Sequence, residues 1–418
     1  MKGREEQTKA ITQAIYAPGR HVFIFGERGV GKTSLAKTAG LAATTNSTCF
    51  RQIGCAVDST FEEVIRQIVE VFNPERLSSV STSTNWGLSQ LLAIGSSQQR
   101  SYAPPPPITV SAAADMLASL DDDKRGDLRV VVIDEIERLQ NLDARLKFAE
   151  LVKLLGDRGA RLTIIFTGVG TDLTEILGAH ESAFRQFLQI KLERLDYQSS
   201  LDIVDDALDR FDLSWEIEPV RTARFRIASI ANGFPYYVHL LTERLLYALY
   251  DDKSAEVINL VHLRNAITAA VSGVSEQIRQ PYDKATRGRN EVYTLATWAA
   301  ADSWDLERAT SDIYASYESI CRALTTEPVE KPRLSQVLAS LKAASHGSLL
   351  RPGFRQGQHV FVENIYRGYV RLCADAAGVQ LHDLRPESPL LTSTIGGRSK
   401  RYFRSDSAGS PPKGFERR

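Results

Sequence analysis

The stretch FIFGERGVGKTSLAK, residues 23–37, decides the fold of the N-terminal part of this 418-residue chain. Within it, residues 26–33 match the phosphate-loop pattern GxxxxGK(S/T) without a mismatch. The apolar run HVFIFG (21–26) precedes the glycines, and TSLAKTAGLAA, an expected helix, follows them. A buried strand, a glycine-rich turn and a helix in this order hold the phosphates of a nucleotide. The sequence therefore predicts a nucleoside triphosphate site.

The residue types of this loop each suit phosphate binding. Glycines let backbone N–H groups turn inward, and the helix N-terminus adds a favourable dipole. We expect Lys32 to reach the β and γ phosphates and Thr33 to ligate magnesium, so ATP and Mg²⁺ are the expected cofactors. The nucleotide-binding residues predicted from the loop are Gly26, Glu27, Arg28, Gly29, Val30, Gly31, Lys32, Thr33 and Ser34.

A second chemical element is RVVVIDEIERL, residues 129–139, in which an apolar run ends in two acids. At the carboxyl end of a strand near the loop, Asp134 can hold the metal through water and Glu135 can polarise the attacking water. Taken alone, the pair is equally consistent with a solvated strand end. Together with the phosphate loop upstream it favours hydrolysis, because a small-molecule kinase would need a second substrate site that the sequence does not indicate.

Further apolar runs indicate how the core is built. CFRQIGCAV (49–57), RVVVID (129–134) and RLTIIFTG (161–168) are typical of buried strands, and helical patterns such as STFEEVIRQIVEVF (59–72) separate them. This alternation predicts a parallel sheet covered on both faces. We expect an α/β P-loop NTPase core over residues 1–195.

The rest of the chain divides by composition. Residues 73–111 are rich in Ser, Thr and Gln and contain four consecutive prolines, which predicts an insert that is either functional or mobile. After the core, strand patterns give way to a helical lid at 196–282. A segment of short helices ending in a hairpin is expected at 283–380, followed by a disordered basic tail at 381–418.

Composition limits the classes of partner. Lys plus Arg equals Asp plus Glu, 51 each, so the whole molecule has no strong field that would draw it to DNA or to an anionic membrane. Nucleic-acid contact must therefore come from a local patch. No apolar run approaches the ~20 residues of a membrane helix, and the scattered cysteines show no metal-binding spacing. We expect a cytoplasmic protein with reduced thiols and no membrane partner.

The order of these motifs resembles the AAA+ ATPases over residues 10–280. That resemblance implies that Thr167, in IIFTG, is the sensor-1 residue that orients the attacking water. It also implies that Arg185, in ESAFRQFLQIKLERL, is an arginine finger reaching a neighbouring subunit, and hence a homo-oligomer. Read from the residues alone, Thr167 is equally a strand-end hydroxyl and Arg185 an ordinary solvated residue, with Arg194 as the rival finger.

The lid contains NGFPYYVHLLTERL, residues 232–245. Many AAA+ proteins carry a sensor-2 arginine here, whereas this sequence has none before Arg244. The turn is similar to the GxP turn of the signal-transduction ATPases with numerous domains, which implies that Pro235 packs near the base and puts rapid turnover in doubt. Tyr236 and His239 are either nucleotide contacts or lid core and surface.

The C-terminal segment resembles the winged-helix domain of the origin-recognition initiator ATPases. RGRNEVYTLATWAAA, ATSDIYASYESICRAL and RLSQVLASLKAASHGSLLR give three helices, and GFRQGQHVFV gives a wing. The third helix of such domains often enters the major groove of DNA. This implies groove contacts from Arg333, Gln336, Ser340 and Lys342, and backbone contacts from Arg351, Arg355, Gln358 and His359.

The sequence is therefore consistent with two functions. In the first, an ATP-binding and hydrolysing AAA+ switch controls engagement of double-stranded DNA or of a partner protein through its nucleotide state. In the second, a signal-transduction ATPase regulates a protein partner without binding DNA; winged helices also serve as protein-docking or self-inhibiting modules. Steep salt dependence of binding would distinguish DNA contact from protein docking.

Overall fold

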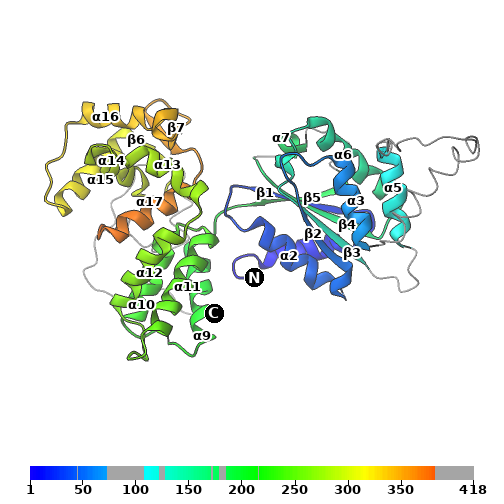
Figure 1. The fold of residues 1–418 in the computed structure, drawn as a ribbon, viewed down its shortest axis with the longest axis horizontal. Coiled ribbons are helices and arrows are strands. Elements are labelled where there is room, and N and C mark those ends of the chain that lie inside the picture. The colour runs from blue at the N-terminus through cyan, green and yellow to red at the C-terminus, as the bar shows by residue number, and fades with distance from the viewer. Residues whose placement is uncertain are drawn as a thin grey trace, which may run out of the picture. The chain divides into compact units, whose positions relative to one another are not determined.

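The computed structural model describes residues 1–44, 46–72, 108–121, 128–170, 173–177, 185–214 and 216–381. They belong to two compact units, Met1–Glu193 and the chain from Arg194 onward (Figure 1). The predicted insert at 73–111, apart from residues 108–111, and the predicted tail beyond residue 381 lie outside the described residues. No helix in the described ranges is long and apolar enough to cross a membrane.

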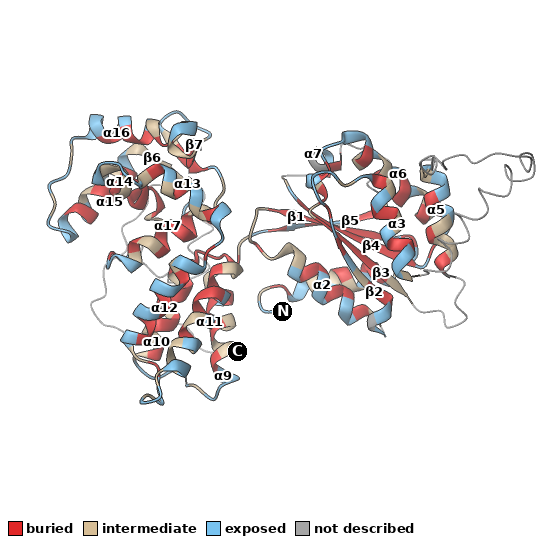
Figure 2. Ribbon diagram, viewed as in Figure 1, coloured by how far each residue is buried: buried red, intermediate tan, exposed pale blue. Residues whose placement is uncertain are grey.

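The first unit contains a five-stranded parallel sheet with the strand order β2-β3-β4-β1-β5. Its three central strands, β3, β4 and β1, are almost entirely buried, as expected for apolar runs covered on both faces, whereas the edge strands β2 and β5 are partly exposed (Figure 2). The prediction of a P-loop NTPase core with a parallel sheet is confirmed. The strands are β1 (His21–Gly26), β2 (Phe50–Gly54), β3 (Arg129–Asp134), β4 (Leu162–Val169) and β5 (Phe187–Leu192).

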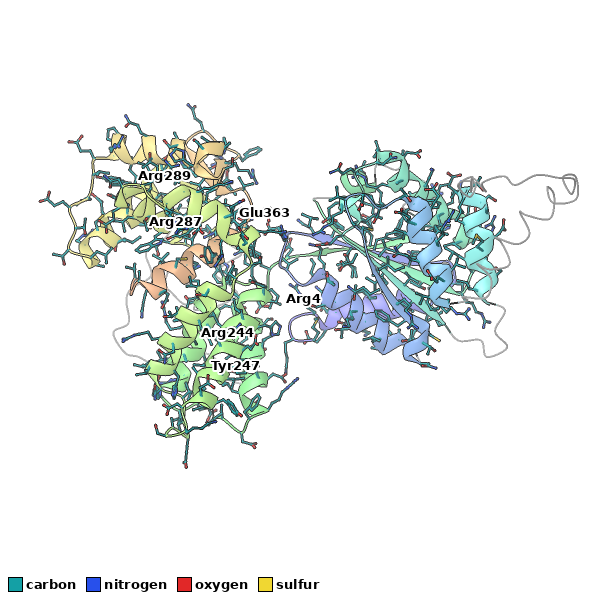
Figure 3. The ribbon with its side chains drawn as sticks, viewed as in Figure 1. Arg4, Arg244, Tyr247, Arg287, Arg289 and Glu363 are labelled. Carbon is teal, nitrogen blue, oxygen red and sulfur yellow. The ribbon has the colours of Figure 1, made fainter. Side chains whose placement is uncertain are left out.

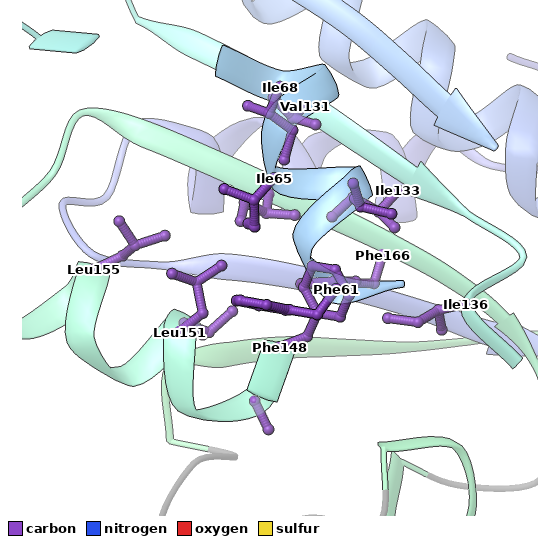
Figure 4. Packing of buried hydrophobic residues seen from close by; sticks show 14 of the residues in the cluster. Phe61, Ile65, Ile68, Val131, Ile133, Ile136, Phe148, Leu151, Leu155 and Phe166 are labelled. Carbon is purple, nitrogen blue, oxygen red and sulfur yellow. The ribbon is translucent and has the colours of Figure 1, made fainter. Parts of the chain in front are cut away.

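Helices cover both faces of this sheet (Figure 1). Three phenylalanines pack together against one face of the sheet (Figure 4). The ring centroids of Phe61 and Phe148 lie 4.9 Å apart and those of Phe148 and Phe166 lie 5.9 Å apart, and both pairs pack edge to face. Burying each ring contributes roughly 1.5–3 kcal/mol. The helices are α1 (Glu5–Ile15) and α2 (Lys32–Ala43) on one face, α3 (Phe61–Phe72), α5 (Val110–Ala118) and α6 (Leu142–Asp157) on the other, and the short α7 (Leu173–Leu177).

The second unit begins with the four helices of the predicted lid. The Asp196 side chain caps the first of them by accepting from the Ser199 N–H at 2.6 Å, and Pro235 occupies the first turn of the third. Before that proline, Gly233 has φ +81°, and a Cβ there would lie 2.4 Å from the Leu195 carbonyl oxygen. The lid helices are α9 (Tyr197–Asp209), α10 (Val220–Ala231), α11 (Pro235–Asp251) and α12 (Leu260–Gly273).

The C-terminal segment combines short helices with a three-stranded antiparallel sheet of order β6-β8-β7. The helices and the hairpin expected from the sequence are present. Strand β6 and the last helix were not predicted. The elements are α13 (Glu276–Thr286), α14 (Glu291–Ala301), β6 (Glu307–Ala309), α15 (Thr310–Ala323), α16 (Lys331–Ser340), β7 (Leu350–Pro352), β8 (Gln358–Phe361) and α17 (Ile365–Ala376).

Helix α17 joins the C-terminal segment to the lid. The buried Tyr237 hydroxyl on α11 donates to the Ile365 carbonyl at 2.8 Å. A Cβ on Gly368 would lie 2.2 Å from the Tyr237 ring, so only glycine allows this approach. The buried Arg371 donates to the Asn232 side chain at 3.1 Å. The lid and the C-terminal segment therefore share one core.

Candidate functional site

The phosphate loop connects β1 to α2 through three glycines with positive φ, a backbone region that other residues rarely adopt. Gly26 has φ +145°, and a Cβ there would lie 2.3 Å from the Leu192 carbonyl oxygen. Gly29 and Gly31 have φ +80° and +95°, and Gly31 is the N-cap of α2. The loop is therefore a backbone cradle at a helix N-terminus, the form that anionic phosphate requires.

Lys32, the first residue of α2, lies over this cradle. Its Nζ donates to the carbonyl oxygens of Gly26 at 3.1 Å and Glu27 at 2.7 Å. Burial lowers the pKa of its ammonium group, and nearby carboxylates, led by Glu137, oppose that shift. A partly desolvated ammonium group beside the glycine-rich backbone is suited to bind nucleotide phosphate, because the phosphate would supply the opposite charge.

Asp134, at the end of β3, is the centre of a hydrogen-bond network. Its Oδ1 accepts from the hydroxyl of Thr33 at 2.9 Å and from that of Thr167, and its Oδ2 accepts from Gln52 at 3.2 Å. Strand β4 lies between β3 and β1, and the Thr33 hydroxyl joins Asp134 to the phosphate loop across this distance. A hydroxyl and a carboxylate in contact fit a magnesium ion that also binds phosphate oxygens.

Thr167 connects the two acidic residues. Its hydroxyl donates to Asp134 and accepts from the backbone N–H of Glu135 at 3.2 Å. Glu135 has φ +57°, in the left-handed region. The hydroxyl thus helps to fix the direction in which the Glu135 side chain leaves the strand. These contacts fit a satisfied strand-end hydroxyl and are also compatible with a positioning residue, so the sensor-1 role of Thr167 stays a prediction.

The Glu135 carboxylate itself is held by a residue that sequence reasoning missed. Its Oε2 lies 2.8 Å from Nε of Arg138, and both side chains are 42% exposed. The sequence shows that Glu135 and Arg138 are three residues apart. It does not show the one-turn 3₁₀ helix Ile136–Arg138 that brings their side chains together. The exposed pair can be broken at low free-energy cost.

Glu137 and Gln52 were also missed. Burial raises the pKa of Glu137, although its own backbone N–H and that of Val169 oppose the shift. Its Oε2 is buried without a hydrogen-bond partner among the described residues. The DEIE spacing is the signal that could have identified Glu137. Gln52 had no such signal, because its contact depends on β2 pairing beside β3 in register.

The two candidate arginine fingers have different surroundings. Arg185 is exposed in the turn before β5. Arg194 belongs to the second unit, where it donates to the Asn232 carbonyl at 3.0 Å and lies over the rings of Phe234 and Trp304, 6.0 and 5.5 Å from their centroids. These contacts give Arg194 a structural role, so Arg185 remains the predicted finger.

Residues 1–165 match the sequence family described as the AAA ATPase domain. The N-terminal part of this chain is an AAA ATPase domain. The matched range contains the phosphate loop, Asp134 and Glu135, so the chain is an ATPase. Thr167 and Arg185 lie beyond the range.

One solved structure supports a common fold. The Walker-type ATPase PABY2304 of Pyrococcus abyssi is 15% identical, with 89% of this chain and 96% of that chain covered and a TM-score of 0.50. The ORC2 protein of Aeropyrum pernix is 12% identical (90% and 96% covered, TM-score 0.46), and Cdc6p of Pyrobaculum aerophilum is 16% identical (88% and 93% covered, TM-score 0.43). Only the first score indicates a common fold. No curated protein matches the sequence.

The residues predicted to contact DNA lie on the C-terminal segment. Arg333 and Gln336 are exposed on α16 and joined by a hydrogen bond of 3.1 Å, whereas Lys342, after that helix, is half-buried. Arg351 and Arg355 are exposed on the hairpin, while Ser340 and Gln358 are half-buried.

The predicted DNA contact of His359 is wrong. Its side chain is buried, and its Nε2 lies 2.9 Å from the Thr310 hydroxyl.

Two further exposed cations, Arg287 and Arg289, lie between α13 and α14 (Figure 3). Arg289 donates to the Ser345 carbonyl at 2.7 Å and lies 5.6 Å from the centroid of the Tyr293 ring. That ring in turn stacks on His346 with the centroids 5.4 Å apart. These contacts hold the connection against the 3₁₀ turn Ala344–His346 that follows α16.

Proposed function

We propose that ATP binding and hydrolysis in the AAA ATPase domain control engagement of double-stranded DNA by the C-terminal segment. The observation that carries this proposal is the charge of residues 331–362. They contain Lys331, Arg333, Lys342, Arg351 and Arg355 and no Asp or Glu, in a chain whose total formal charge is zero. These residues are α16 and the hairpin that follows it.

The order of elements supports a winged helix. Helix α14, strand β6, helices α15 and α16, and the hairpin of β7 and β8 follow one another, with the three strands in one antiparallel sheet. In such domains the helix before the hairpin enters the major groove and the hairpin contacts the backbone. Arg333 and Gln336 would then face bases, and Arg351 and Arg355 would face phosphates.

The ATPase domain supplies the energy for this control. Lys32 would bind the β and γ phosphates, and Thr33 with Asp134 would hold magnesium. Glu135 would polarise the attacking water once Arg138 releases its carboxylate. Contacts made with the γ phosphate are lost after hydrolysis, and that difference is what a nucleotide-driven change of state requires.

A homo-oligomer is part of the proposal. Arg185 is exposed in the turn before β5, where it could reach the nucleotide of a neighbouring copy. Arg185→Ala should then lower turnover and leave ATP binding intact. Equal loss of binding and turnover would mark Arg185 as structural instead.

The decisive experiment measures binding of the purified chain to a short mixed-sequence duplex with ATP, with ADP and without nucleotide across a salt series. Several phosphate contacts make the affinity fall steeply as salt rises. Lys32→Ala, which should abolish ATP binding, serves as the matched control and should remove the nucleotide dependence. Absence of duplex binding in every state would refute the proposal.

A second candidate, a switch that regulates a protein partner, is favoured by the turn before α11. Gly233 approaches Leu195 closely, and the Leu195 N–H donates to the Gly233 carbonyl at 2.8 Å, so Pro235 starts α11 from a fixed turn. In this alternative Pro235 packs near the base and retains the nucleotide. Slow release of ADP combined with salt-insensitive partner binding would support it.

A further inference from the structure

The turn between β7 and β8 presents an aromatic side chain to solvent. Phe354 is 94% exposed, whereas the next most exposed large apolar residue that the structure describes, Tyr250, is 70% exposed. Transferring such a ring from water to an apolar environment is favourable, and nothing in the described core uses it. A phenylalanine at the tip of a hairpin is therefore available to an external apolar surface.

The backbone that carries Phe354 is fixed. Its N–H donates to the Glu307 carboxylate on β6. On either side, the Gly353 N–H donates to the Gln358 carbonyl at 2.9 Å and the Arg355 N–H donates to the Gln358 side chain at 3.0 Å. The ring thus projects from a turn held by the three-stranded sheet, which lowers the ordering cost of inserting it elsewhere.

The charges around the tip select the kind of surface. Arg351 and Arg355, on either side of Phe354, are exposed cations, and the hairpin contains no acidic residue. The nearest carboxylate, that of Glu307, accepts the Phe354 N–H and is thereby tied to the turn. A projecting apolar ring between two arginines is complementary to nucleic acid, which presents stacked bases between two lines of phosphate.

We propose that Phe354 is a wedge that enters the minor groove of double-stranded DNA and partly unstacks one base step, while Arg351 and Arg355 bind the flanking phosphates. This inference rests on the proposed function and adds to it. A wedge of this kind kinks the duplex and prefers pyrimidine–purine steps, which unstack at least cost. It would give the protein a preference for deformable DNA without hydrogen bonds to base edges.

The test compares wild type, Phe354→Ala and Phe211→Ala on two duplexes, one with a central TA step and one with an A-tract. Phe211 is a matched control because it is also an exposed phenylalanine, 63% accessible, outside the basic region. Affinity is measured by fluorescence anisotropy in a salt series, and kinking by energy transfer between dyes at the duplex ends. Thermal unfolding checks that each variant is folded.

Phe354→Ala should weaken binding to the TA duplex about tenfold, remove the kink and remove the preference over the A-tract. Its salt dependence should match wild type, because the phosphate contacts remain. Phe211→Ala should behave as wild type. If Phe354→Ala binds and kinks both duplexes as wild type does, the wedge is refuted and the proposed function stands. If wild type binds neither duplex, both the wedge and the proposed function fail.

Discussion

Replacing Thr167 by valine tests the part of the site that the structure defines most closely. The Thr167 hydroxyl makes two contacts at once, donating to Asp134 and accepting from the Glu135 N–H. Valine keeps the buried volume and removes both. The bond to a carboxylate is the larger loss, because charged hydrogen bonds contribute about 1.5–3 kcal/mol and neutral ones about 0.5–1.5. If only the charged bond acts in the transition state, turnover should fall roughly 10- to 150-fold.

Phosphate release at saturating ATP measures this loss, and binding of a fluorescent ATP analogue shows whether the phosphate loop still works. Thr167→Ser is the matched control, since it keeps the hydroxyl and removes one methyl group, and its turnover should stay within about threefold of wild type. Valine turning over as fast as wild type would refute the positioning role. Equal inactivity of serine and valine would show that methyl packing matters instead.

Three other predictions concern chemistry, packing and pH. Glu135→Gln should bind ATP normally and lower phosphate release about 100-fold or more; unchanged turnover would remove Glu135 from the reaction. Gly368→Ala should cost about 1–3 kcal/mol in urea unfolding because its methyl group meets the buried Tyr237 ring, whereas Gly273→Ala, with ordinary contacts, should be close to neutral; equal effects would contradict the close fit. Burial, with Lys342 nearby, lowers the pKa of His359 from 6.5 to about 4. The unfolded chain therefore takes up this proton first, and the associated stability is present above about pH 6.5 and lost as the pH falls toward 4. Wild type should lose up to about 2 kcal/mol more unfolding free energy than His359→Gln between about pH 7 and pH 5, and parallel curves would contradict this.

Local patterns were sufficient to predict the parallel sheet and the phosphate loop of the first unit. The apolar run at 21–26 and the acids at 134 and 135 are β1 and the end of β3, because parallel strands buried on both faces are read directly from composition. The phosphate loop needed no tertiary information either, since its glycine positions follow from backbone geometry. These features are encoded within a few residues of one another.

Features that depend on distant pairing were not predicted. Gln52 reaches Asp134 only because β2 lies beside β3, and no local signal encodes that neighbour. Strand β6 has three residues, too few for a period to be visible, and it becomes a strand by pairing with β8. Helix α17 was missed because two arginines, Arg367 and Arg371, lie on its buried face. They interrupt the apolar periodicity by which a buried helix face is recognised in a sequence.

The place of α17 at the end of the described chain limits how the protein can be divided. A chain shortened after the hairpin would lose the hydrogen-bond partner of Tyr237 and expose the interior of the lid, so the end of the C-terminal segment cannot be removed without damage to the lid helices. The lid and the C-terminal segment therefore cannot be exchanged between relatives as independent modules by recombination at a single junction. A fragment beginning at the lid, in contrast, would keep every contact that α17 makes.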